Sequence, residues 1–230
     1  MADRAQPPLD LVSQGPCGDA SIHTHLEDGR RICIRTVSPA DEARLREGIA
    51  RMSPRSRYLR FFSGGASPPD WVIERLLDAD GVLHLAWGAL DLGDPAQPAM
   101  GVVHAMRPDA GDAVAEFSVG VVDAYHGLGI GRLLTATLLL DAAGGRLEAF
   151  RAHVLSENDA ARSFIKRLGG VHVGQDGPQA EYLLEVAPAL ARLREESRPG
   201  GLAAIFAHFD AREAAAAADQ AGRGSLSSRP

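Results

Sequence analysis

The chain has 230 residues, a formal net charge of -6 and 45% hydrophobic residues, which suits one domain-sized core and excludes global disorder. No apolar run approaches the roughly 18 residues of a membrane span, and the N-terminus carries no secretory signal, so we expect a cytoplasmic protein without a membrane partner. The acidic balance argues against nucleic acid as a partner, because phosphate binding needs a basic surface. Cys17 and Cys33 provide neither a disulfide framework nor a zinc-ligand spacing.

The first part of the chain predicts an arm, a hairpin and three helices. Residues 1–20 contain Pro, Gly and Asp without periodicity, which is typical of a flexible arm. Asp28-Gly29 lies between two extended runs and is a strong hairpin signal, because Gly accepts a positive φ. Three Ser-Pro pairs then predict helix starts, at residues 38, 53 and 67.

From residue 83 the pattern changes to strands. Three short Val/Ala-rich runs separated by turn residues predict consecutive antiparallel strands over 83–91, 99–106 and 113–122. A glycine-rich turn then leads into an apolar helix that ends at Gly144-Gly145. The remaining predicted elements are a strand over 146–155, a helix over 157–168, strands over 171–174 and 181–186, and helical stretches over 189–197 and 201–219.

These elements predict a mixed α/β fold. The strands on either side of the central helix are expected to be parallel, because a helical crossover joins them. The predicted organisation is a flexible arm over 1–20, one domain over 21–187, and a helical C-terminal extension with a disordered tail over 188–230.

The turn between the strand 113–122 and the next helix is the most informative segment. Its alternating glycines would let backbone N–H groups approach an anion, and the helix N-terminus favours phosphate. A Walker A loop needs Gly-Lys-Ser/Thr, and the single lysine, Lys166, follows Ile165, which excludes that motif. The dinucleotide fingerprint would need glycine at position 132, where Arg132 stands, and an early βαβ unit, which makes it a poor match.

The segment His126-Gly127-Leu128-Gly129-Ile130-Gly131 resembles the (Gln/Arg)-x-x-Gly-x-(Gly/Ala) loop of the GNAT superfamily of acetyl-CoA-dependent N-acetyltransferases. Three ordered blocks resemble the acetyltransferase domain of bacterial Pat-type protein-lysine acetyltransferases: EDGRRICIRTVSPADEARLREGIARMSPRSRYLRFF, AEFSVGVVDAYHGLGIGRLL and VLSENDAARSFIKRLGG. The resemblance spans about residues 24–186. It implies the GNAT fold, a mostly antiparallel sheet whose parallel central pair splays apart around the pantetheine arm of acetyl-CoA.

The resemblance also implies which residues bind acetyl-CoA, the expected co-substrate, with no metal. Backbone groups of Val119 and Val121 would bond the pantetheine amides as an added strand would. Asn158 matches a family asparagine near the pantetheine. The pyrophosphate would lie on the turn, where the amides of residues 128–132 are the donors; the residues concerned are His126, Gly127, Leu128, Gly129, Ile130, Gly131 and Arg132.

Three positions depart from the family pattern. His126 stands where Gln or Arg is usual, although much of that loop binds through its main chain. Ile165 occupies a position at which many relatives carry a tyrosine general acid, and Gly170 the position of a common Phe. A thiol pKa of about 8.5 makes the departing thiolate a fair leaving group, which softens the loss of the tyrosine.

Glu116 is the candidate catalytic base. A lysine ε-amine has a pKa of about 10.4 and must be neutral before it attacks a thioester. In Pat-type relatives a glutamate in this "AEF" position is the base, and partial burial on the strand would favour that role. The alternative is a surface glutamate that pairs with an arginine.

Three functions stay open. The first is an N-acetyltransferase that acts on protein lysine ε-amines, with a protein carrying the acceptor lysine as its partner. The second is an acetyltransferase for a small amine. The third is a non-catalytic acyl-CoA-binding regulatory module, for which the missing tyrosine and His126 leave room.

Other polar clusters have ordinary explanations. His23 and His25 share a strand face, but no third ligand is expected near them, so a metal is not predicted. Arg55, Arg57 and Arg60 are interpreted as a solvated face. The apolar side of the helix 201–219 suits docking on the domain or on a second copy in a homodimer, and the sequence leaves both open.

Overall fold

The computed structural model describes residues 17–18 and 21–226, with side chains to residue 219. The strands are β1 (Ile22–His25), β2 (Arg31–Thr36), β3 (His84–Asp91), β4 (Ala99–Met106), β5 (Val114–Val121), β6 (Ala149–Leu155), β7 (Val171–Asp176) and β8 (Gln179–Glu185). The α-helices are α1 (Glu42–Ala50), α2 (Pro54–Phe61), α3 (Asp70–Leu77), α4 (Ile130–Gly144), α5 (Asp159–Arg167), α6 (Val186–Glu195) and α7 (Leu202–Leu226).

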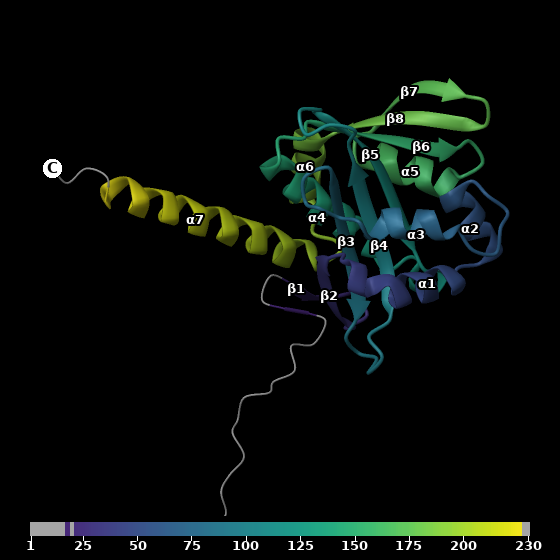
Figure 1. Ribbon diagram of the computed structural model, residues 1–230, viewed down its shortest axis with the longest axis horizontal. Coiled ribbons are helices and arrows are strands. Elements are labelled where there is room, and N and C mark those ends of the chain that lie inside the picture. Colours follow the sequence, from purple (N-terminus) through teal and green to yellow (C-terminus); the bar gives the residue numbers. More distant parts are fainter. Residues whose placement is uncertain (1–16, 19–20, 227–230) are drawn as a thin grey trace, which may run out of the picture.

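The strands form one sheet in the order β1-β2-β3-β4-β5-β6-β8-β7 (Figure 1). All neighbours are antiparallel except β5 and β6, which are parallel and are joined through α4. This confirms the predicted mixed α/β fold with a parallel central pair. The hairpin at Asp28-Gly29 is also confirmed, with Gly29 at a φ of 81° between β1 and β2.

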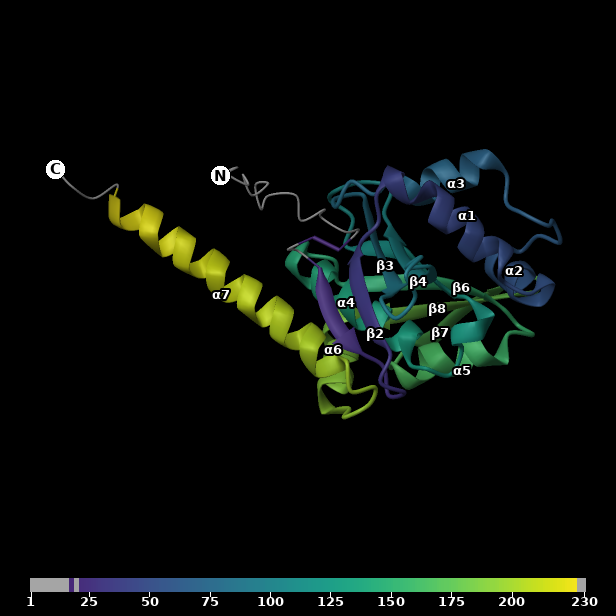
Figure 2. The same cartoon turned by 90° about the horizontal axis from the view of Figure 1, so that it is seen from below.

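Helices cover both faces of the sheet. Helices α1 to α3 lie on one face, and α4, α5 and α6 lie on the other (Figure 2). The main apolar core lies under α4, whose Leu133, Leu134, Leu138 and Leu139 are fully buried. A smaller cluster of Ile49, Ile73 and Leu77 holds α1 and α3 together.

The C-terminal extension packs through its first part only. Helix α6 lies on α4, and the start of α7 contacts α4 and β1. The buried side chains of α7 are Leu202, Ile205, Phe206 and Phe209, whereas residues 210–219 are all exposed. The helix continues to Leu226, past the expected end at residue 219. The remainder of the predicted tail, 227–230, lies outside the described residues, as do 1–16 and 19–20 of the predicted arm.

The two cysteines form a disulfide. Cys17 and Cys33 are joined, with their Cα atoms 6.5 Å apart, and Cys33 is fully buried in β2. This pairing differs from the sequence-based expectation of no disulfide framework, because two cysteines 16 residues apart carry no spacing signal. The pairing depends instead on where the chain before β1 runs relative to β2.

No helix in the described part of the chain combines the length and the apolar character needed to cross a bilayer.

Candidate active site

The glycine turn is built as an anion-facing helix start. Strand β5 ends at Val121, a single 3-10 turn spans Asp123–Tyr125, and Gly127 and Gly129 adopt φ of 78° and 84° before α4 begins at Ile130. Side chains with a Cβ atom rarely adopt such positive φ values, so glycine is needed at both positions. The first amides of α4 have no acceptor within the helix and are therefore available to a ligand.

The last residue of the predicted turn is already engaged. The backbone N–H of Arg132 donates to the Gly129 carbonyl over 3.0 Å. The guanidinium of Arg132 forms an ion pair of 2.9 Å with Glu196, from the segment after α6. The amides left for a phosphate are therefore those of Leu128 to Gly131, one fewer than the sequence predicts.

His126 closes the turn onto the end of β5. Its exposed imidazole lies 2.9 Å through Nε2 from the Val121 carbonyl oxygen, so Nε2–H is the donor. This hydrogen bond gives His126 a structural role, because it ties the glycine turn to the end of β5. It also occupies the Val121 carbonyl, which leaves the Val121 N–H as the group that a pantetheine amide could bond.

The parallel pair β5–β6 separates halfway along β5. Their register runs from Val114 opposite Ala149 to Glu116 opposite Arg151 and stops there, while β5 continues to Val121. Val122 donates to the Met100 carbonyl of β4 over 2.9 Å. Because successive residues of a strand direct their backbone groups to alternate sides, Val119 and Val121 direct theirs away from β4, toward the side that β6 has left.

Asn158 begins α5 just past the end of β6. Its Oδ1 accepts a hydrogen bond of 3.1 Å from the Ala161 backbone N–H, which caps the helix. Asn158 is half-buried, and its side-chain NH₂ group remains as the donor for the pantetheine contact that the family resemblance implies.

Glu116 lies where the β5–β6 ladder ends. It faces Met106 of β4 on one side and Arg151 of β6 on the other. The side chain is exposed, so the expected partial burial is wrong. Arg151 pairs with Glu181 over 2.8 Å. Glu116 shares the face of β5 with Ser118 and Gly120, which is the face that Arg60 of α2 contacts.

Arg60 of α2 is the residue of this site that the sequence analysis missed. Its guanidinium donates to the Ser118 hydroxyl over 2.9 Å and lies over Gly120, on the same face of β5 as Glu116. Burial lowers the pKa of Arg60 to about 10, and the charge of Glu116 opposes that shift. The prediction of a solvated face is therefore wrong for Arg60. Arg55 does lie at the surface, where it pairs with Glu157 over 2.8 Å.

Helix α2 is fastened to the glycine turn at its other end. The Asp123 carboxylate accepts hydrogen bonds from the Ser53 backbone N–H at 2.9 Å and the Ser56 hydroxyl at 2.8 Å. Burial raises the pKa of Asp123, but these hydrogen bonds outweigh it and hold the pKa at about 2. The helix that carries Arg60 is thus positioned by the turn that begins α4.

A histidine pair is buried on this face of the sheet. His84 donates from Nδ1 to the Asp78 carbonyl at 2.9 Å, and its Nε2 lies 2.9 Å from Nδ1 of His104. Burial lowers the pKa of both rings, and the charge of Arg60 lowers that of His104 further. The hydrogen bonds then require the proton of His104 on Nδ1 and leave its Nε2 without a partner.

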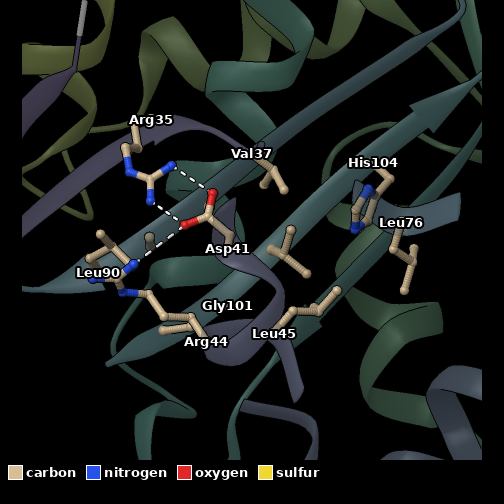
Figure 3. Close-up of a pocket in the computed structure, with 13 residues that line it drawn as sticks. Arg35, Val37, Asp41, Arg44, Leu45, Leu76, Leu90, Gly101 and His104 are labelled. Carbon is tan, nitrogen blue, oxygen red and sulfur yellow. Dashed lines mark hydrogen bonds and ion pairs between the residues drawn. The ribbon is translucent and has the colours of Figure 1, made fainter. Parts of the chain in front are cut away.

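Two small cavities lie between α1–α3 and the sheet. The first, about 40 Å³, has the Arg35–Asp41 ion pair at one end and His104 and Leu76 at the other (Figure 3). The second, about 50 Å³, is lined by Arg60, Gly120 and Val121 among others. Neither includes Glu116 or the glycine turn, and each has room for little more than water molecules.

The comparisons with known proteins agree with this geometry. The acetyltransferase (GNAT) family matches residues 58–170, which include β5, the glycine turn and α4. The chain belongs to the GNAT acetyltransferase family. Within the family, it is 31% identical over 159 residues to the acetyltransferase Pat of Mycolicibacterium smegmatis, a match that covers 67% of this chain and 46% of that protein. The chain thus spans about half the length of this relative.

Solved structures share the fold. The GNAT domain of S. lividans PAT superposes with a TM-score of 0.66 and 21% identity, over 72% of this chain and 97% of that chain. Arabidopsis thaliana NAA60, solved in complex with acetyl-CoA, superposes with a TM-score of 0.53 and 18% identity, over 68% of this chain and 99% of that one.

Proposed function

We propose that this protein transfers the acetyl group of acetyl-CoA to the ε-amine of a lysine on a protein. One observation carries the proposal: β5 has an open edge from Phe117 to Val121, with Glu116 at its beginning and the glycine turn at its end. An extended acyl carrier bound along that edge would have its reactive end near Glu116 and its phosphates near the α4 N-terminus. The family and its acetyl-CoA-bound fold neighbour support the same co-substrate.

The residues present fit acetyl-CoA, which supplies the thioester that is attacked. The amides of Leu128, Gly129, Ile130 and Gly131 would hold the pyrophosphate. Because β5 has no neighbour along its open edge, the backbone groups of Val119 and the N–H of Val121 could pair with the pantetheine amides as a strand would. Asn158, which follows the C-terminal end of β6, would contact the pantetheine from the other side of the gap between β5 and β6.

Glu116 would take the proton from the attacking amine, directly or through a water molecule. As the amine adds to the acetyl carbon, negative charge develops on the acetyl oxygen, and the Val119 N–H would stabilise it as a fixed donor. The departing thiolate needs no strong acid, because a thiol has a pKa of about 8.5. No general acid is therefore assigned.

A protein acceptor is supported by the likeness to Pat and by an exposed aromatic side chain at the end of α2, the helix that supplies Arg60. The helix ends at Phe61, and the next residue, Phe62, is 40% exposed. An exposed aromatic side chain two residues beyond Arg60 would contact the neighbours of an acceptor lysine, which a small amine lacks.

The test is release of free thiol from acetyl-CoA, measured with protein acceptors and with small amines. We expect turnover on lysine-bearing protein substrates. Glu116→Gln should lower kcat/KM by about 10²- to 10⁴-fold, the range for loss of a general base, without weakening acetyl-CoA binding.

Glu185→Gln is the matched control, since Glu185 is another exposed glutamate in a strand of the same sheet, and it should retain full activity. Turnover restricted to small amines would contradict the protein acceptor. Tight acetyl-CoA binding without turnover on any acceptor would indicate a regulatory module instead.

A further inference from the structure

A cluster of three metal-binding side chains lies at the edge of the sheet, away from β5 and the glycine turn. The Sγ atoms of Cys17 and Cys33 and an imidazole nitrogen of His23 all lie within 4.8 Å of one another. No other group of three such side chains was found among the described residues. None of these residues takes part in the proposed acetyl transfer.

The three donors come from the β1–β2 hairpin and from the chain before it. His23 of β1 is directly opposite Cys33 of β2 in the antiparallel register, so both side chains project from the same face of the hairpin. Cys17 reaches the same face from the chain before β1 and bonds to Cys33. Cys33 is fully buried, Cys17 is half-buried and His23 is exposed, so the cluster opens to solvent on the histidine side.

The donor set matches zinc. Thiolate sulfur and imidazole nitrogen are the preferred ligands of Zn²⁺, which they bind at about 2.3 and 2.0–2.1 Å. Two ligands of one tetrahedral zinc ion are about 3 to 4 Å apart, so small side-chain rotations would bring all three donors onto one ion. A water molecule on the exposed side would complete the fourth position.

We propose that Cys17, Cys33 and His23 form a zinc-binding site when the disulfide is reduced, and that oxidation closes this site. Sulfurs bonded to each other are not thiolates, so the disulfide and the zinc complex exclude each other. The sequence alone does not predict a metal at His23, because nothing in the spacing of the residues indicates that Cys17 and Cys33 lie beside it.

Each step balances. A phosphine reductant attacks one sulfur, the Cys17–Cys33 bond breaks, and water supplies the oxygen of the phosphine oxide and the protons of two thiols. Zinc binding then releases two thiol protons and forms two Zn–S bonds and one Zn–N bond. Oxidised glutathione reverses the process: the two thiolates give up two electrons and form the disulfide, the two glutathione thiolates that leave take up two protons from water, and Zn²⁺ is released.

The experiment measures zinc retained by the full chain. The protein is reduced with a phosphine, freed of reductant under anaerobic conditions, loaded with Zn²⁺ and desalted; an oxidised sample is treated in the same way without reduction. We expect about one zinc per chain in the reduced protein and none in the oxidised protein. Co²⁺ in place of Zn²⁺ should give a thiolate-to-cobalt charge-transfer absorption, which reports sulfur ligation directly.

His23→Gln and His25→Gln form the decisive pair. Both histidines are exposed on the same face of β1, and only His23 belongs to the cluster. His23→Gln should weaken zinc binding at least tenfold, because even the loss of a residue that only supports a ligand costs about 10- to 100-fold. His25→Gln should leave zinc binding unchanged, and Cys17→Ser should abolish the cobalt charge-transfer band.

Two results would overturn the proposal. One is a reduced protein that retains no more zinc than the oxidised protein. The other is equal zinc retention by His23→Gln and His25→Gln. Since both histidines are exposed, these variants test the site without depending on a folding defect.

Discussion

Arg60 shows how the environment of one side chain depends on a distant part of the chain. Helix α2 carries Arg55, Arg57 and Arg60, and of these Arg60 donates a hydrogen bond to Ser118 of β5. Its pKa of about 10, lowered by burial, still keeps it charged at neutral pH. A cation therefore stays fixed on the face of β5 that carries Glu116. The proton transfer proposed for Glu116 would take place near this positive charge.

His104 allows a prediction about pH and stability. Because its pKa is lowered by burial, the folded state binds fewer protons than the unfolded state once the pH falls below about 6.5, the ordinary histidine value. The free energy of unfolding should then fall by up to about 1.4 kcal/mol for each pH unit below 6.5. His104→Gln, which can still donate to His84 but does not titrate, should reduce this decline and leave the part that comes from His84, whose pKa is also lowered by burial.

Urea unfolding between pH 7 and pH 5 measures the effect. The control is His153→Gln, since His153 is an exposed strand histidine, and its slope should match that of the unchanged protein. A slope that His104→Gln leaves intact would mean that another buried group causes the loss of stability in acid.

At the scale of elements, the start of α4 is supported by the segment that follows α6. Glu196 pairs with Arg132, and Gly201 lies against Leu133. Pro199 approaches Gly129 so closely that a Cβ atom at residue 129 would lie 2.8 Å from the Pro199 Cβ. The C-terminal extension thus contacts the same turn whose amides are proposed to hold the pyrophosphate.

Two glycines of the turn should therefore respond differently to substitution. Gly127 and Gly129 share a positive φ, but only Gly129 faces a close neighbour, since nothing lies within 4 Å of a Cβ atom at Gly127. Gly127→Ala should lower the free energy of unfolding by about 1–2 kcal/mol, the cost of the left-handed conformation. Gly129→Ala should cost at least about 1 kcal/mol more, because the overlap adds to the same strain.

Chemical denaturation of both variants measures these costs. Pro199→Gly removes the atoms that a Cβ at residue 129 would meet. Adding Gly129→Ala to Pro199→Gly should therefore lower the free energy of unfolding only by the cost of the left-handed conformation, without the extra cost of the overlap. Equal costs for the two single variants would contradict a tight contact between Pro199 and the turn.

At the scale of the whole molecule, local signals predicted the order of the elements. The Asp28-Gly29 hairpin and the glycine turn were predictable because each depends on a conformation that glycine accepts. The parallel pair followed from the helical crossover. These features depend on residues close together in the chain, and periodicity and turn chemistry report such residues directly.

Features that depend on contacts between distant segments were not predictable. The Cys17–Cys33 disulfide needs the path of the chain before β1, and the half-buried position of Arg60 needs the docking of α2 on β5. Arg151, opposite Glu116 in the register of β5 and β6, pairs with Glu181 of β8, a partner that the spacing along the chain does not indicate. The role of His126 likewise depends on the Val121 carbonyl, which becomes available only where β6 leaves β5.

Helix α7 divides into a docked first part and an exposed second part. Phe209 packs against Trp87 at 6.0 Å between ring centroids, and Arg194 pairs with Asp210 over 3.1 Å, after which residues 211–219 are exposed (Figure 1). Because a short isolated helix is marginal in water, amide hydrogens of 212–219 should exchange with solvent orders of magnitude faster than those of 205–209. Hydrogen–deuterium exchange read by mass spectrometry measures this, and uniform protection along α7 would contradict it.

The projecting helix also affects how the size of this protein is measured. At 1.5 Å per residue, the 17 residues from Asp210 to Leu226 add about 25 Å on one side, whereas a compact chain of 230 residues has a radius of gyration of about 17 Å. A monomer of this shape experiences more friction than a sphere of equal mass and elutes early from a gel-filtration column. Light scattering or sedimentation equilibrium, which report mass independently of shape, are therefore the measurements that distinguish a homodimer from a single chain with an extended helix.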